Sequence, residues 1–138
     1  MTGCGSGIFT AGSVLLGADY VLGIDIDEDA LSNCRDNLTS IFDEDSEVSY
    51  DLLQADITND DIFGRLHKSF DTVIMNPPFG TKVKGKWVCY ESSKLWPLIC
   101  FAGIDMVFLE RALQLATECV YSLHKSSTRE VNVVTNLG

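Results

Sequence analysis

The sequence predicts an α/β fold in which a mostly parallel β-sheet is covered by helices on both faces. Three observations predict it. Short apolar segments that suit strands alternate along the chain with longer segments of helical periodicity. A glycine-rich segment at the start leads directly into an apolar stretch that suits a helix. Several predicted strands end at an acid or an amide, which is typical of sheets whose carboxyl ends form a ligand site.

The first half of the chain contains the glycine-rich segment and two predicted strands. Residues 2–7 alternate glycine with other residues and run into residues 8–16, which are apolar and suit a helix. Residues 20–24 form a short apolar run that suits a strand buried on both faces. Residues 50–55 form the next predicted strand, after an acidic loop over 43–49.

A helix is predicted between these two strands, beginning after Asp27. The Asp27 side chain suits an N-cap, and the acids that follow it suit the first helical turn. Three side chains fall on one face of this helix, namely Leu31, Cys34 and Leu38.

The second half of the chain adds two more strands. Residues 59–68 are polar and predict a short helix or a loop. Residues 72–75 form a buried strand that stops at an Asn-Pro-Pro-Phe motif. A helical pattern covers 105–118, and a last strand is expected over 119–123. The apolar stripe of that helix comprises Met106, Leu109, Leu113 and Ala116.

Composition limits the classes of protein. With 138 residues the chain is expected to be one domain, 1–138, and its 46% hydrophobic residues are enough for a core. The net charge of −10 argues against a protein that coats nucleic acid. The five cysteines have no C-x-x-C spacing and no histidine placed to complete a zinc pattern, so reduced thiols and no metal site are expected. No apolar segment is long enough to span a membrane.

The glycine-rich segment is the first candidate binding site. Gly3, Gly5 and Gly7 let a ligand approach the backbone closely, and the following helix adds free N–H groups. Asp25 ends the next strand, where its carboxylate suits the hydroxyls of a ribose. NAD also fits this pattern, but the G-x-G-x-G spacing favours S-adenosylmethionine, whose small amino-acid portion packs against the loop. A plain turn followed by an acid that caps a helix is the alternative.

Two further strand ends are expected on the same edge of the sheet. Asp56 ends the second strand and Asn76 ends the third. The Asp56 carboxylate suits the adenine amino group of the cofactor. The alternative is an aspartate that only caps its own loop.

The tetrapeptide Asn76-Pro77-Pro78-Phe79 is the most specific motif. Its two prolines fix the backbone and remove two N–H donors, so the corner presents acceptors only. The Asn76 side-chain oxygen and the Pro77 carbonyl can each accept one N–H of a planar amino group, which frees the nitrogen lone pair for a methyl group held on a sulfonium. Phe79 can stack on the flat substrate. Catalysis would rest on orientation and electrostatics, without a covalent intermediate or a metal.

In this order of motifs the sequence resembles class I amino-methyltransferases, and more specifically the methyltransferase-like protein 5 family. Three segments carry the resemblance: G-I-D-I-D-E-D-A-L at 23–31, K-S-F-D-T-V-I-M-N-P-P-F-G-T-K at 68–82 and V-Y-S-L-H-K-S-S-T-R-E at 120–130. The resemblance covers roughly residues 3–82 and 103–130. It implies a Rossmann-like fold and methylation of an adenosine at N6 in small-subunit ribosomal RNA.

The resemblance also implies roles, a partner and a location. It assigns Gly3, Ser6 and Asp25 to the cofactor, Asp56 and Ile57 to the sides of its adenine, and residues 76–79 to catalysis. It implies a heterodimer with a small zinc-binding activator subunit that adds a strand to the sheet edge. We expect such a protein in the nucleus and cytoplasm.

The sequence departs from the family in three places. Met1 and Thr2 stand where the family has the end of its central first strand, and the C-terminal strands are also missing. Residues 83–102 and 131–138 do not match the family, and their codons can resemble intron boundaries, so we interpret both segments as translated introns. Without the central strand, we expect the isolated chain to be poorly stable and weakly active or inactive.

Other functions remain open. An N-P-P corner also suits the amide of a protein glutamine, although the Phe-Gly-Thr-Lys continuation favours RNA. DNA adenine is a third target, but no DNA-recognition domain is evident. A non-catalytic isoform that only binds the activator or RNA is the alternative from a different class.

Overall fold

A computed structural model describes residues 2–43, 46–77 and 104–123, with the backbone alone for 104–106. Strands and helices alternate in it as the sequence predicts. The elements are α1 (Ile8–Leu15), β1 (Val21–Asp25), α2 (Glu28–Ile41), β2 (Tyr50–Gln54), α3 (Asp60–Arg65), β3 (Phe70–Met75), α5 (Ile104–Leu115) and β4 (Ala116–Ser122).

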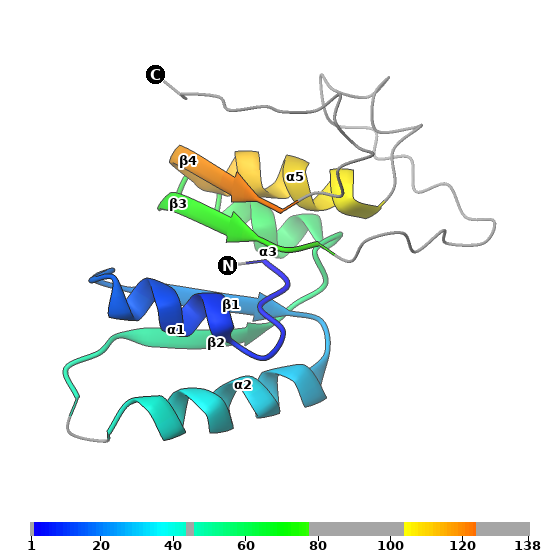
Figure 1. Ribbon diagram of the computed structural model, residues 1–138. Coiled ribbons are helices and arrows are strands. Elements are labelled where there is room, and N and C mark those ends of the chain that lie inside the picture. Colours follow the sequence, from blue (N-terminus) through cyan, green and yellow to red (C-terminus); the bar gives the residue numbers. More distant parts are fainter. Residues whose placement is uncertain (1, 44–45, 78–103, 124–138) are drawn as a thin grey trace.

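Both strand pairs within the described residues are parallel, which agrees with the predicted sheet type. β1 pairs with β2 in a continuous register from Val21 opposite Tyr50 to Asp25 opposite Gln54. β3 pairs with β4, and Met75 lies opposite Ser122 at its end. The carboxyl ends of the strands therefore lie along one edge of the sheet (Figure 1).

Thr2 connects the two strand pairs. It forms a parallel bridge to Ile24 of β1 and another to Met75 of β3. Its N–H donates to the carbonyl of Ile74 at 3.3 Å, and the N–H of Cys4 donates to the carbonyl of Ile24 at 3.0 Å. The chain start lies between β1 and β3 in Figure 1. Thr2 thus occupies the end of one strand position between them, as the resemblance implies.

Helices cover both faces of the sheet, as predicted. Adjacent residues of β2 show this, because successive side chains of a strand point to opposite faces. Leu52 packs against the core of α1 and α2, which comprises Cys4, Ala11, Leu31, Cys34 and Leu38. Leu53 packs against a separate core that contains Phe63 from α3 and several side chains of α5.

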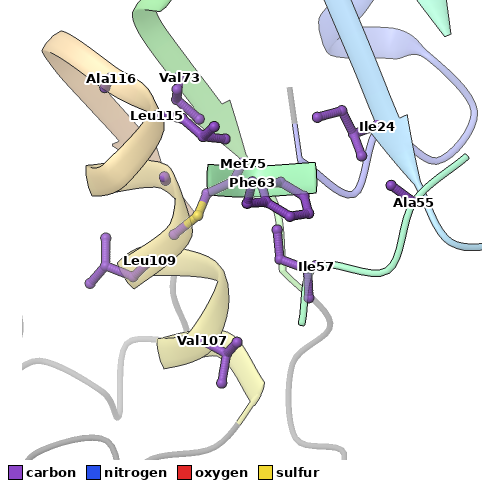
Figure 2. Packing of buried hydrophobic residues seen from close by; sticks show 11 residues of the cluster. Ile24, Ala55, Ile57, Phe63, Val73, Met75, Val107, Leu109, Leu115 and Ala116 are labelled. Atoms are coloured by element: carbon purple, nitrogen blue, oxygen red, sulfur yellow. The ribbon is translucent and has the colours of Figure 1, made fainter. Parts of the chain in front are cut away.

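The core on the α3 and α5 side lies next to the carboxyl ends of the strands. Phe63 and Met75 lie at its centre (Figure 2), and both are fully buried. Ile24 joins them from β1, Ile57 from the segment after β2, and Leu109 from α5. Burying a side chain of this size stabilises a fold by roughly 1.5–3 kcal/mol.

The predicted helix start at Asp27 is confirmed by its cap, and a second capped helix lies in the segment 59–68, for which a short helix or a loop is predicted. Asp27 accepts hydrogen bonds from the N–H groups of Asp29 (3.0 Å) and Ala30 (3.4 Å). The polar segment after Asp56 contains α3, and Asn59 caps it by accepting from Asp61 and Ile62 at 3.0 and 3.3 Å. Both caps satisfy N–H groups that have no partner within the helix.

The predicted helix over 105–118 is wrong at its end, because residues 116–118 belong to β4. Lys68 ends α5 early: its N–H donates to the carbonyl of Gln114 (2.9 Å), and its Nζ donates to that of Ala116 (2.6 Å). Ala116 then pairs with Phe70, so β3 also begins earlier than predicted. These contacts join residues far apart in sequence, and helical periodicity does not reveal them.

Several predictions concern residues outside the described ranges. They are Pro78 and Phe79 of the motif, the unmatched segment 83–102 and the tail 131–138. Among the helices that are described, none is both long and apolar enough to cross a bilayer.

Candidate active site

The glycine loop leads from Thr2 to the start of α1. Gly3, Gly5 and Gly7 all have positive φ, at 67°, 52° and 87°. Gly7 caps α1 in the left-handed conformation, and its carbonyl accepts the N–H of Ala11 at 2.8 Å. A Cβ added at Gly7 would lie 2.5 Å from the Sγ of Cys34, which is fully buried in α2. The loop therefore lies directly on α2.

We expect the substitution Gly7→Ala to lower the free energy of unfolding by about 2–3 kcal/mol, because it adds left-handed strain and a clash with Cys34. The matched control is Gly12→Ala in α1, where a Cβ meets no atom within 4 Å. Alanine there should raise stability by up to about 1 kcal/mol. Urea unfolding monitored by circular dichroism measures both variants. Equal midpoints for Gly7→Ala and the wild type would contradict the packing described.

Asp25 holds the glycine loop over the end of β1. Its Oδ2 accepts the N–H of Gly5 at 2.8 Å, and its Oδ1 accepts the N–H of Asp27 at 3.1 Å. A carboxylate oxygen can accept two hydrogen bonds, so each oxygen retains an acceptor position. Binding of ribose hydroxyls by Asp25 stays a prediction. In the structure its carboxylate also holds the glycine loop in place.

Asp56 follows β2 and closes a turn. Its Oδ1 accepts both the N–H and the hydroxyl of Thr58, each at 2.8 Å, and its carbonyl accepts the N–H of Asn59 at 2.9 Å. This is the loop-capping role that the sequence left as an alternative. Ile57, which follows, is buried in the core of Figure 2. Contact of either residue with a cofactor stays a prediction.

The Asn-Pro corner lies next to the glycine loop. Asn76 is exposed at the end of β3, whereas Pro77 is fully buried. A Cβ added at Gly3 would lie 3.7 Å from the carbonyl oxygen of Asn76. It would also lie 3.2 Å from the Cε1 atom of Phe108. The structure thus brings Gly3 and Asn76 together, although they lie 73 positions apart in sequence.

The predicted site residues share this edge because the strands are parallel. The N–H of Ala55 donates to the carbonyl of Asp25 at 2.9 Å, which aligns the ends of β1 and β2. Ser6 is exposed in the glycine loop, and its carbonyl accepts the amide of Asn37 at 2.9 Å. The gathering of the glycine loop, Asp25, Asp56 and Asn76 is as predicted.

The thiols below the loop are not nucleophiles at neutral pH. Burial, with smaller contributions from the nearby Cys34 and Asp25, raises the pKa of Cys4 to about 12. Burial also raises the pKa of Cys34. Because only the thiolate attacks an electrophile, both groups stay inert near pH 7. Within the ranges that the structure describes, no three His, Cys, Asp or Glu side chains could hold a metal ion.

Residues 2–76 match a known protein family. The model of the ribosomal protein L11 methyltransferase (PrmA) family matches residues 2–76, which include the glycine loop, Asp25, Asp56 and Asn76. The chain belongs to this methyltransferase family. The match ends at the Asn-Pro corner, so it covers the edge of the sheet described above.

The resemblance to methyltransferase-like protein 5 is also confirmed. The zebrafish protein named rRNA N(6)-adenosine-methyltransferase METTL5 is 43% identical over 129 residues, which are 93% of this chain and 51% of that protein. The Drosophila melanogaster protein of the same name is 42% identical over 127 residues, 92% of this chain and 49% of that protein. The chain spans about half the length of these curated relatives.

Solved structures show the same Rossmann-like fold. A Thermoplasma acidophilum protein superposes with a TM-score of 0.58 and 29% identity, over 94% of this chain and 52% of that one. A provisionally named RNA methyltransferase from Pyrococcus horikoshii gives a TM-score of 0.59 and 25% identity, over 94% and 52% of the two chains. The predicted fold class of this methyltransferase is therefore confirmed.

Two residues near the site were missed by sequence reasoning. Phe108 touches the glycine loop from α5, and Arg111 of the same helix donates a hydrogen bond to the carbonyl of Ile57. Both lie inside a helical pattern in which they look like ordinary interior and surface positions. No sequence signal marks them, because their partners lie far away in the chain.

Proposed function

We propose that this methyltransferase transfers a methyl group from S-adenosylmethionine to the N6 amino group of an adenosine in small-subunit ribosomal RNA. One observation carries the proposal. Thr2 bridges both β1 and β3, which puts the glycine loop beside the Asn-Pro corner. A cofactor at the loop and an amino group at the corner would therefore be neighbours.

The charges of the edge favour S-adenosylmethionine over NAD. The carboxylates of Asp25 and Asp56 lie there, and they suit a ligand that carries a cationic sulfonium and an amino group. A pyrophosphate would be repelled by the same carboxylates. Gly5 leaves open space, because a Cβ there would meet no atom within 4 Å. Gly5, Ser6 and Gly7 would hold the amino-acid portion of the cofactor, and Asp25 would accept hydrogen bonds from its ribose.

The Asn76 corner supplies the chemistry of the substrate side. When bound, S-adenosylmethionine supplies a methyl group on a positively charged sulfur. The side-chain oxygen of Asn76 and the carbonyl of Pro77 would accept the two N–H groups of the adenine. This holds the amino group in line and makes its lone pair available, so that orientation and fixed dipoles lower the barrier. Phe79 would stack on the base.

We expect Asp25→Ala to weaken S-adenosylmethionine binding by about 10- to 100-fold, because it removes the ribose acceptor and releases the N–H of Gly5. The matched control is Asp36→Ala, an exposed aspartate on α2 away from the edge. Isothermal titration calorimetry measures the dissociation constants. If both variants bind as the wild type does, Asp25 does not hold the cofactor.

The acidic chain needs help to bind RNA. Its net charge of −10 repels phosphate groups, so a partner with a basic surface would favour complex formation. We propose the small zinc-binding activator subunit for this role, docked by strand addition to an outer edge of the sheet. The heterodimer would act in the nucleus and cytoplasm.

A labelled-methyl assay tests the proposed function. The protein is incubated with tritiated S-adenosylmethionine and either small-subunit ribosomal RNA or ribosomal protein, with and without the activator. Label recovered as N6-methyladenosine supports the proposal. Label on a glutamine amide supports the protein-methyltransferase alternative instead. Cofactor binding without transfer to either substrate, even with the activator, supports a non-catalytic isoform.

A further inference from the structure

Arg111 is a buried cation that joins α5 to the segment after β2. Its side chain is 7% exposed. The Nε–H donates to the carbonyl of Ile57 at 3.0 Å, across 54 positions of the sequence. Nη2 forms an ion pair with Asp60 at the start of α3. The guanidinium also lies over the ring of Phe63, with 5.7 Å between its carbon and the ring centroid.

These contacts require an arginine. A buried charge is tolerated only when it is paired and hydrogen-bonded, and the planar guanidinium reaches several acceptors at fixed angles. Nη1 also donates a hydrogen bond to Oε1 of Gln114 at 2.8 Å, within α5 itself. The contacts with Ile57, Asp60 and Phe63 reach toward the segment after β2. Arg111 thus holds this segment against α5.

The fixed segment begins at the candidate cofactor edge. Ile57 directly follows Asp56, whose side chain closes the turn with Thr58. The hydrogen bond to the carbonyl of Ile57 therefore fixes the position of the Asp56 turn at the end of β2. We propose that Arg111 is a positioning residue that holds the Asp56–Ile57 turn in place for the adenine of the cofactor. This inference rests on the proposed function, which puts the adenine there.

The test compares Arg111→Met with Gln114→Met in the full-length protein. Methionine keeps most of the volume of Arg111 but removes its donors, while Gln114→Met removes only the bond within α5. Amide hydrogen exchange over residues 56–60 and steady-state kinetics with S-adenosylmethionine are the readouts. For Arg111→Met we expect faster exchange and a KM for S-adenosylmethionine raised about tenfold, with kcat within about twofold of the wild type. Gln114→Met should match the wild type in both.

A second variant covers a failure of Arg111→Met to fold. The Asp60 side chain is 57% exposed, so Asp60→Asn removes the ion pair without creating a cavity in the core. It should shift exchange and KM in the same direction, by less. Unchanged exchange and KM in these variants, or a fall in kcat alone, would overturn the inference. If the wild type binds no S-adenosylmethionine, the proposed function fails, and the exchange result alone decides whether Arg111 holds the turn.

Discussion

Replacing Asn76 with alanine is expected to lower the rate of methyl transfer by about 100-fold or more, with little effect on folding. The loss follows from the removal of one fixed acceptor aimed at the reacting amino group, and losses of this size are typical for such groups. Folding should be spared because the Asn76 side chain is exposed, while Pro77 and Met75 beside it carry the packing. Single-turnover transfer of a labelled methyl group to ribosomal RNA measures the effect.

The matched control for this experiment is Asn33→Ala. Asn33 is exposed on α2, far along the chain from the corner, and it receives the same change of side chain. Its rate should equal that of the wild type. Both variants should bind S-adenosylmethionine as the wild type does, because Asn76 would contact the substrate adenine and Asn33 lies on α2. An Asn76→Ala protein with unaltered transfer would exclude the proposed role of the corner.

An apolar strand joined upstream of Thr2 is expected to raise the free energy of unfolding by on the order of 3 kcal/mol. Thr2 forms parallel bridges to both Ile24 and Met75, so a strand that continues backward from it would run between β1 and β3. It would form hydrogen bonds with the facing edges of β1 and β3 and bury side chains in both cores. These gains exceed the conformational entropy that the added residues lose.

The control for the added strand has the same length but alternates glycine and serine. It can form hydrogen bonds but buries no apolar side chain, so it should stabilise the chain far less. Urea unfolding of the chain, with each extension and with none, measures the difference. If both extensions gave the midpoint of the chain without one, the space between β1 and β3 would not be a strand position. The expectation that the isolated chain is poorly stable depends on the same point.

Local signals made much of the fold predictable. The cap at Asp27, the alternation of apolar and helical segments, and the acids or amides at strand ends depend on residues close in sequence. The parallel order of the strands then places Asp25, Asp56 and Asn76 on one edge, which is why the candidate site could be assembled from motifs. Burial of Leu31, Cys34 and Leu38 on one helix face follows from helical periodicity.

Features that depend on distant contacts could not be predicted. The end of α5 is set by Lys68, which bonds to carbonyls more than 40 positions away. The contact of Phe108 with Gly3 and the bond of Arg111 to Ile57 also join distant segments. The bonds of Asp25 to Gly5 and of Asp56 to Thr58 show that both carboxylates support their loops as well. A motif does not separate such a supporting role from ligand binding.

Calorimetric titration with S-adenosylmethionine shows whether the glycine loop and Asp25 bind this cofactor beside the Asn76 corner. We expect one binding event per chain, with a dissociation constant on the order of 1–100 μM, that Asp25→Ala weakens strongly and Asn76→Ala leaves intact. Absence of binding to the folded wild-type protein, or equal binding by Asp25→Ala, would contradict it.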